Sequence, residues 1–302
     1  MLHKKRLMMF IFGCSVISVL IGCKKIGQEN KGGAQQEQKQ VVEVVTVKIG
    51  DIEETIPLTG DIHGDKEVKV YAKVSGKLNR KIKTEGDYIK KDEVVAMIDR
   101  DEEALKFSEA EVKSPIDGVV TMYFVGLGEA VFPAQPTPRD PVVMVADIDN
   151  IKVIVYLSDR DIGKVKKDQP ARITVDAYPD RTFKGVVTNV DPAANPMTRK
   201  LKVEITVPNP GHLLKPGTFA RVEIIVQEHK NVLLVPRVAV LEREGNKIVF
   251  TCENNLAKII NVLTGAEDEK NIEIKKGLEQ NQEVITEGNY ALTEGTKVEF
   301  VR

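Results

Sequence analysis

The sequence predicts an all-β protein of several domains, and three observations carry that prediction. Valine and isoleucine are abundant, and apolar residues alternate with polar ones over short segments, as in half-buried strands. Long apolar runs with the 3.6-residue period of a helix are nearly missing. Glycine and proline separate the segments, and a chain of 302 residues is long enough for about two to four domains.

Two glycine-punctuated segments, Val74–Asp99 and Pro115–Asp147, repeat each other. The register is lost at Ala134–Asp140, where the second copy is about six residues longer, and it resumes with Val95–Asp99 aligned on Val143–Asp147. A shift of 42 residues superimposes the structural turn glycines of the two copies, Gly76 and Gly86 on Gly118 and Gly128.

Neither copy is long enough to close a hydrophobic core alone, so the two must bury their apolar faces against each other. The glycines mark turns at which a Cβ would clash. Two such halves form a flattened β-sandwich with a pseudo-twofold axis. The pattern resembles a lipoyl or biotinyl domain, with residues 66–99 as the first half and 114–148 as the second.

The segment between the halves, residues 100–113, is predicted to be a short connector. Its acidic residues at 101–103 suit the first turn of a helix, and Ala104, Phe107 and Ala110 fall on one helical face. A helix of about two or three turns is therefore expected, and a long helical hairpin is excluded by the length.

Residues 149–229 are predicted to form a six-stranded β-barrel with one short helix. Their segments alternate apolar and polar residues, and closure into a barrel removes exposed strand edges. Ser158 and the acidic residues after it fit a capping box, which predicts a helix from Asp159 to about Lys164. Asn209-Pro210 and Lys215-Pro216-Gly217 are turn signals, and Gly217 is a further structural turn glycine.

Residues 230–302 contain short strands separated by glycines and are predicted to form a β-roll. The strands before the repeat must pair with something later in the chain. Residues 41–53 are expected to add a strand to the β-roll, and residues 54–65 a strand to the barrel. The resulting arrangement is nested, with domains completed by strands from both ends of the chain.

The N-terminus has the features of an export signal. A basic stretch precedes an apolar segment shorter than a membrane span, so residues 1–22 are predicted to be a lipoprotein signal peptide. Leu20-Ile21-Gly22-Cys23 resembles a bacterial lipobox, which implies lipid attachment at Cys23. Residues 23–40 are rich in Gln, Lys and Gly and are expected to form a disordered tether.

Composition and motif content argue against several functions. The net charge of −1 and the absence of tryptophan give no basis for nucleic-acid binding. Histidines are scattered and no catalytic motif is present, so no enzyme and no cofactor are predicted. The methionines outside the signal are not clustered with each other or with histidine, so no metal site is predicted. Cys252 stands alone and is given no chemistry.

Several short motifs, each weak alone, occur in the order found in one family. They make the chain resemble the periplasmic adaptor subunits, or membrane fusion proteins (HlyD/AcrA-like), of RND-type tripartite efflux pumps. Because the connector at 100–113 is far too short for the helical hairpin of typical members, the chain resembles the hairpin-less kind. The motifs are Val74-Ser75-Gly76, Ser114-Pro115-Ile116-Asp117-Gly118, Pro196-Met197-Thr198-Arg199-Lys200, Leu214-Lys215-Pro216-Gly217 and Val235-Pro236-Arg237.

The resemblance implies an elongated, non-enzymatic adaptor in the periplasm, anchored to the inner membrane by the N-terminal lipid. It would link an inner-membrane RND proton-driven exporter to an outer-membrane TolC-like channel, for efflux of drugs or other amphiphilic compounds. Copies of the chain are expected to assemble into a ring, as a hexamer. Partner contacts are expected at charged residues of the connector and loops: Asp101, Lys106, Lys113, Arg139, Arg199, Lys200 and Lys215.

Two alternatives remain open at this stage. The adaptor could serve an ABC-type or a metal exporter instead of an RND drug exporter. A biotin or lipoate carrier modified at Lys106 is less favoured, because that lysine lies in an acidic, helix-favouring segment of an exported chain, where a solvated surface role is expected.

Overall fold

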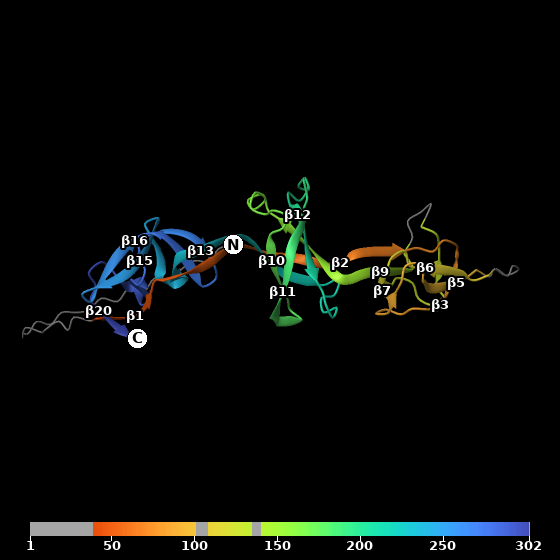
Figure 1. Ribbon diagram of the computed structural model, residues 1–302, viewed down its shortest axis with the longest axis horizontal. Helices are drawn as coiled ribbons and strands as arrows, with labels where there is room; N and C mark the ends of the chain where they lie inside the picture. The colour runs from red at the N-terminus through yellow and green to blue at the C-terminus, as the bar shows by residue number, and fades with distance from the viewer. Residues whose placement is uncertain (1–38, 101–107, 135–139, 302) are drawn as a thin grey trace, which may run out of the picture. The chain divides into compact units, whose positions relative to one another are not determined.

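The computed structural model describes residues 39–100, 108–134 and 140–301 (Figure 1). Regular structure in these ranges is β-strand, apart from two short 3-10 helices, η1 (Arg237–Ala239) and η2 (Asn289–Ala291). The predicted all-β fold class is therefore confirmed. The signal peptide, Cys23 and almost all of the tether lie outside the described residues.

The repeat forms a sandwich of two sheets around one hydrophobic core. The core includes Leu78 and Ile98 from the first copy and Val120 and Val145 from the second, all buried. One sheet has the order β6 (Ala110–Lys113), β5 (Val94–Asp99), β3 (Gly76–Lys81), β8 (Ala130–Val131). The facing sheet is formed by the C-terminal part of β2 (Lys48–Val70), the N-terminal part of β9 (Val143–Leu157), β7 (Gly118–Tyr123) and β4 (Tyr88–Ile89).

The two copies exchange their shortest strands. Strand β4 of the first copy pairs with β7 of the second, with Ile89 opposite Gly118. Strand β8 of the second copy pairs with β3 of the first, with Val131 opposite Gly76. Each pair maps onto the other by the shift of 42 residues. The exchange explains why neither copy closes a core alone, since each sheet contains a strand from the other copy.

The four glycines of the repeat serve two different purposes. Gly76 and Gly118 lie where strands approach closely: an added Cβ would stand 2.2 Å from the carbonyl oxygen of Asp99 and 2.5 Å from that of Ala146, respectively. Gly86 and Gly128 have open space around them but φ values of +97° and +80°, a region that favours glycine.

Strand pairing corrects the predicted alignment in the second part of the repeat. Leu78 pairs with Ile98, and its counterpart Val120 pairs with Val145. The Ile82 N–H donates to the Val95 carbonyl at 2.9 Å, and the equivalent Phe124 N–H donates to Val142 at 3.0 Å. The shift is therefore 47 residues here, and the alignment of Val95–Asp99 on Val143–Asp147 was wrong by one residue.

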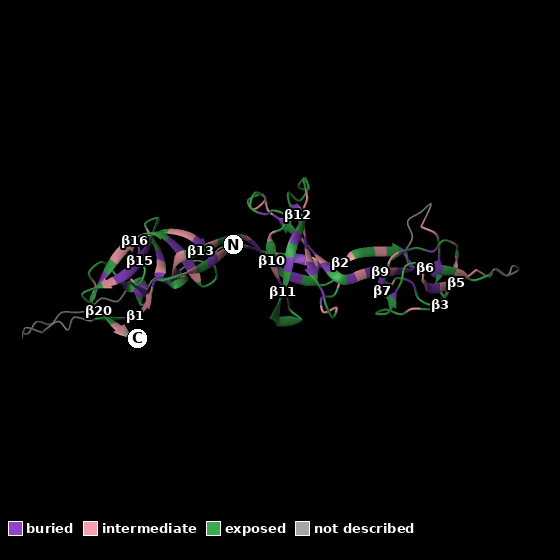
Figure 2. Ribbon diagram, in the orientation of Figure 1, coloured by how far each residue is buried: buried purple, intermediate pink, exposed green. Residues whose placement is uncertain are grey.

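A closed six-stranded antiparallel barrel forms the second module, as predicted. Its strands follow the ring β9–β12–β11–β10–β13–β2 and back to β9. Buried residues alternate with intermediate or exposed ones along much of these strands (Figure 2), and Val155, Ile173 and Ile205 are among the fully buried side chains. The strands not yet bounded are β10 (Pro170–Val175), β11 (Tyr178–Val190), β12 (Leu201–Pro208) and β13 (Phe219–Pro236).

Two predicted helices are not observed where the structure describes them. The Asp159–Lys164 segment forms two successive turns, in which Asp161 N–H donates to Ser158 and Lys164 N–H donates to Asp161, each at 3.0 Å. In the connector, Ala110–Lys113 is strand β6, which pairs with β5. Residues 101–107 of the expected connector helix lie outside the described residues.

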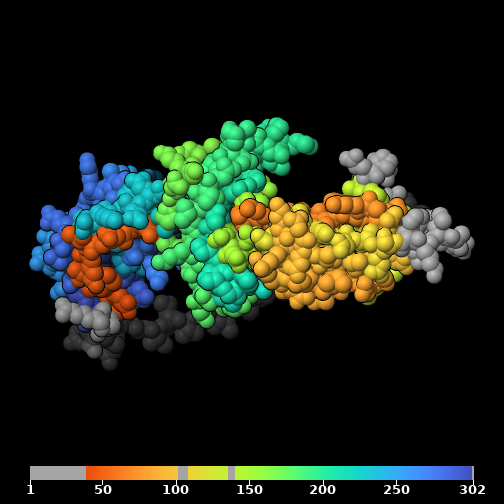
Figure 3. Space-filling model, turned by 45° about the vertical axis from the view of Figure 1, so that its right-hand side comes forward, coloured from red at the N-terminus to blue at the C-terminus, as the bar shows by residue number. Residues whose placement is uncertain are grey.

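The third module combines the C-terminal residues with the first strand of the described chain. Strand β1 (Gln40–Thr46) pairs with β19 (Glu283–Glu287) and, in parallel, with β20 (Val298–Val301). Figure 3 shows the red residues of the N-terminal strands among the blue C-terminal residues. The remaining strands are β14 (Val240–Arg243), β15 (Asn246–Glu253), β16 (Leu256–Asn261), β17 (Leu263–Glu267) and β18 (Asn271–Lys276).

Three long strands, β2, β9 and β13, belong to more than one module. Strand β2 pairs with β13 from Lys48 to Asp61 and with β9 from Gly60 to Val70. Strand β9 pairs with β7 in the sandwich and with β12 in the barrel. The C-terminal end of β13, from Leu233 to Pro236, pairs with β18. The modules are thus joined by paired strands in addition to single loops, and hydrogen bonds run across each junction.

Candidate functional site

The loop between β11 and β12 presents an exposed apolar side chain on a fixed backbone. The Asn195 side-chain oxygen accepts the backbone N–H of Met197 at 2.9 Å and of Thr198 at 3.2 Å. The backbone of Asn195 also bonds Arg199 and Lys200. These bonds hold the turn, and Met197 at its tip is 93% exposed. A hydrogen-bonded loop with an exposed methionine is suited to protein contact, because little backbone conformational entropy is lost on binding.

The loop between β12 and β13 is held by a buried asparagine. Asn209 is 1% exposed. Its side-chain amide donates to the carbonyls of Ile148 at 3.0 Å and Leu214 at 2.9 Å, and its oxygen accepts the Leu214 N–H at 2.9 Å. The loop continues through Gly217, whose φ is +84° and whose N–H donates to Ile62 in β2. This network places the exposed Lys215 beside β2.

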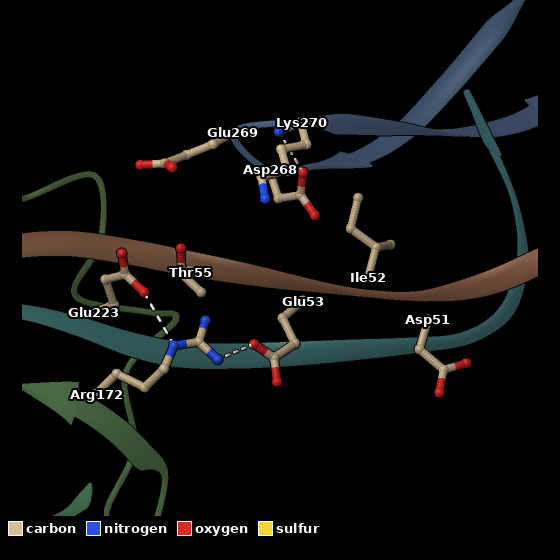
Figure 4. A pocket seen from close by; sticks show the side chains of 9 residues that line it. All are labelled: Asp51, Ile52, Glu53, Thr55, Arg172, Glu223, Asp268, Glu269 and Lys270. Atoms are coloured by element: carbon tan, nitrogen blue, oxygen red, sulfur yellow. Dashed lines mark hydrogen bonds and ion pairs between the residues drawn. The ribbon is translucent and has the colours of Figure 1, made fainter. Parts of the chain in front are cut away.

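A pocket of about 370 Å³, lined mainly by charged residues, lies beside strand β2, and Arg172 projects toward it (Figure 4). The Arg172 guanidinium donates to Glu53 at 2.5 Å and to Glu223 at 3.1 Å, and so joins β10, β2 and β13. Partial burial alone would lower the pKa of Arg172, but the hydrogen bonds to the two carboxylates raise it. The Asp268 carboxylate on the opposite wall accepts the backbone N–H groups of Lys270 and Asn271. The side chains of Arg172, Glu53, Glu223 and Asp268 are therefore engaged in contacts that hold the fold.

The structure does not bring the predicted contact residues into one place. Lys113 ends strand β6 and lies 2.8 Å from Glu111, whose hydrogen bond raises the pKa of Lys113. Arg199 and Lys200 share the Met197 loop, whereas Lys215 lies in the Asn209 loop. The other predicted contacts, Asp101, Lys106 and Arg139, lie outside the described residues, as does the lipid-attachment residue Cys23.

The sequence indicates a turn at Asn209-Pro210, but it does not show that the side chains of Asn195 and Asn209 hold the two barrel loops. Asn195 and Asn209 each precede a proline, and Asn-Pro is a known turn signal. That signal gives the turn but not the direction of the side chain, which is exposed in one case and buried in the other. Nothing in the sequence indicates that Met197 is exposed, since a methionine is more often buried.

The described residues offer no cluster suited to a metal ion. Within residues 39–100, 108–134 and 140–301, no group of three His, Cys, Asp or Glu side chains could hold a metal ion. Burial raises the pKa of the Cys252 thiol, which disfavours the reactive thiolate. The same ranges contain no helix that is long and apolar enough to cross a membrane.

Three domain families match the chain one after another. The barrel-sandwich hybrid domain of RND membrane fusion proteins matches residues 66–144. The CusB-like β-barrel domain matches residues 151–228. The C-terminal permuted SH3-like domain of YknX matches residues 232–300. The three ranges coincide closely with the repeat sandwich, the closed barrel and the C-terminal module.

The curated relatives that the chain matches are named multidrug resistance proteins. The multidrug resistance protein MdtA of Salmonella heidelberg (strain SL476) is 30% identical over 206 residues, which cover 65% of this chain and 49% of the relative. MdtA of Yersinia enterocolitica is 28% identical over 214 residues, covering 67% and 47%, respectively. The chain therefore spans about half the length of the curated relatives it matches.

Solved structures show the same fold. MacA from Actinobacillus actinomycetemcomitans superposes with a TM-score of 0.61 at 21% identity, over 80% of this chain and 98% of that one. A MacA–MexA chimera with the Pseudomonas aeruginosa MexA α-hairpin domain gives 0.57 at 23% identity, over the same 80% and 98%.

Proposed function

Because this chain belongs to the RND-type membrane fusion proteins, we propose that it is the adaptor of an efflux system. It links an inner-membrane RND proton-driven exporter to an outer-membrane TolC-like channel. The observation that carries the proposal is the succession of three adaptor domains, joined by the shared strands β2, β9 and β13. The multidrug resistance names of the relatives support drugs or other amphiphilic compounds as cargo.

The proposed mechanism is geometric and needs no reactive group. Each junction between modules is crossed by paired strands, so separating these strands requires ladder hydrogen bonds to break. Such junctions transmit position from one partner to the other. We place the anchor at a lipid on Cys23 and the working form as a hexameric ring in the periplasm. Lys113 and the two barrel loops, with Arg199, Lys200 and Lys215, are the proposed partner contacts.

The proposal is tested by complementation. Deletion of the gene is expected to increase sensitivity to amphiphilic drugs, and the full chain should restore resistance. Affinity purification of the tagged full chain after crosslinking in cells should recover an RND exporter. If drug sensitivity is unchanged and an ABC-type exporter is recovered, the chain is instead the adaptor of an ABC-type exporter.

Substitution of Met197 tests the barrel contact directly. Met197→Asp is expected to weaken binding to the exporter about thirtyfold, because an exposed apolar anchor that enters a partner pocket contributes about 2 kcal/mol. The measurement is the affinity of purified adaptor for the detergent-solubilised exporter. Met197→Leu keeps the apolar volume and should bind like the unaltered chain. Equal affinities for the Asp and Leu variants would remove this loop from the interface.

A further inference from the structure

A second pocket, of about 540 Å³, lies on the outer face of the sheet formed by β2, β9 and β7. Met144 of β9 stands opposite Met122 of β7 and opposite Lys69 of β2, so the three side chains form a row across one face. Phe124 extends the apolar surface, and the Asn209 loop adds a wall through Lys215. A mostly apolar concavity of this size with a few polar groups has the character of a small-molecule site.

The internal repeat serves as a control within the molecule. Met122 is equivalent to Arg80 by the shift of 42 residues, and Met144 is equivalent to Met97 by the shift of 47. In the first copy the charged Arg80 stands opposite Met97 and pairs with Glu109 at 2.8 Å. The same fold position therefore accepts a charged residue. The apolar Met122, which is 48% exposed, is not required by the sandwich and calls for another explanation.

The charges around the pocket favour an anionic ligand. Lys69 lies with its ammonium 5.9 Å from the Phe124 ring centroid, and Lys215 is exposed in the loop. Among the described residues, the contact found for Lys69 is with the Phe124 ring, and neither lysine lies within 4 Å of a carboxylate oxygen. Glu67, the acid of the lining, is already engaged: it accepts the Gly64 N–H at 2.7 Å and lies 3.5 Å from His63. Two lysines without an ion-pair partner thus line the pocket beside one carboxylate that is already hydrogen-bonded.

We propose that this pocket binds an anionic amphiphile. The apolar tail lies on Met122, Met144 and Phe124, whose flexible thioethers adapt to tails of different shape. A carboxylate or sulfonate head group lies by Lys69 and Lys215, where each ammonium donates charge-assisted hydrogen bonds. The site would give the adaptor a ligand of its own, beyond its role as a link. It is tested on the purified chain, so that its failure leaves the efflux proposal untouched.

Calorimetric titration of the full purified chain with decanoate, kept below its micellar concentration, is the test. Decanoate is expected to bind at one site and at least tenfold more tightly than decyltrimethylammonium, which has the same tail and the opposite charge. Lys69→Ala and Lys215→Ala should each weaken decanoate binding about tenfold. Met144→Glu should abolish it, since a carboxylate is then placed on the pocket floor. Lys66→Ala, a neighbouring lysine of β2 outside the pocket, is the matched control and should bind as before.

Three outcomes would overturn the proposal. Absence of decanoate binding is the first, and equal binding of the cationic analogue is the second. The third is decanoate binding that is unchanged in both Lys69→Ala and Met144→Glu, with thermal unfolding showing that these variants are folded.

A further experiment with phosphatidylglycerol vesicles distinguishes a membrane lipid from a soluble amphiphile as the source of the head group. Binding to vesicles that Met144→Glu also abolishes assigns the site to a membrane lipid, whereas binding of free decanoate alone assigns it to a soluble amphiphile.

Discussion

A Gly76→Ala variant is expected to lose about 3 kcal/mol of unfolding free energy, and Gly118→Ala about as much. The added Cβ would lie 2.2 Å from the Asp99 carbonyl oxygen in one case and 2.5 Å from the Ala146 oxygen in the other. Both obstacles are backbone atoms of the paired strand, so no side-chain rotation relieves the clash. The two paired strands must therefore move apart, which also disrupts the exchange of short strands between the two copies. Urea unfolding of the purified chain measures the change.

Substitutions at two other glycines distinguish the cost of a steric clash from the cost of an unfavourable backbone conformation. Gly163→Ala meets no atom within 4 Å and has no positive φ, so its unfolding free energy should change by less than about 0.5 kcal/mol. Gly128→Ala also has open space but requires φ near +80°, which costs about 1 kcal/mol. If Gly76→Ala proved as stable as Gly163→Ala, the close approach of the strands at Gly76 would be refuted.

The sandwich could be predicted from the repeat, but its strand exchange and final register could not. Strands β4 and β8 have two residues each, too few for any periodicity. The one-residue error arose in segments such as Val94–Asp99, where nearly every residue is apolar on both faces. Alternation normally fixes the register, because a slip of one residue moves apolar side chains to the solvent face. In a run that is apolar on both faces this signal is absent.

The barrel helix prediction, and the connector helix prediction where it reaches Ala110–Lys113, failed because tertiary contacts outweighed local preference. In the Asp159–Lys164 segment, Ile162 and the neighbouring Val165 pack against the barrel core. A single turn of helix is costly to nucleate and gains little to offset the loss of that packing. At Ala110–Lys113, strand β5 has an open edge, and pairing with β6 satisfies its backbone groups. Neither the packing nor the open edge is visible in a local sequence window.

The candidate contact residues could be predicted only as charged loop residues. Arg199 and Lys215 are exposed, as expected of cations in turns. The side chains that shape their loops were missed because the sequence does not distinguish an inward-facing Asn from an outward-facing one. The pocket by Met122 was missed for a related reason. Its apolar row consists of residues from three strands that only pairing brings together.

Asn209→Ala is the second variant for which a large effect is expected, a loss of about 3 kcal/mol of unfolding free energy. The side chain is buried, and its removal leaves the carbonyls of Ile148 and Leu214 and the Leu214 N–H without their partner. Buried groups left unpaired incur their full desolvation cost, which exceeds the net contribution of the bonds themselves. Thermal and urea unfolding of the full chain measure the loss.

The matched control is Asn195→Ala, in the other Asn-Pro loop. Asn195 also accepts two backbone N–H groups, but it is exposed, so water replaces the lost acceptor and the unfolding free energy should fall by less than about 1 kcal/mol. The Asn209 loop also forms a wall of the second pocket through Lys215, so Asn209→Ala should weaken decanoate binding while Asn195→Ala should not. Equal loss of stability in the two variants would mean that burial does not distinguish these asparagines. Loss of stability in Asn209→Ala with unchanged decanoate affinity would instead show that Lys215 holds its position independently of the asparagine.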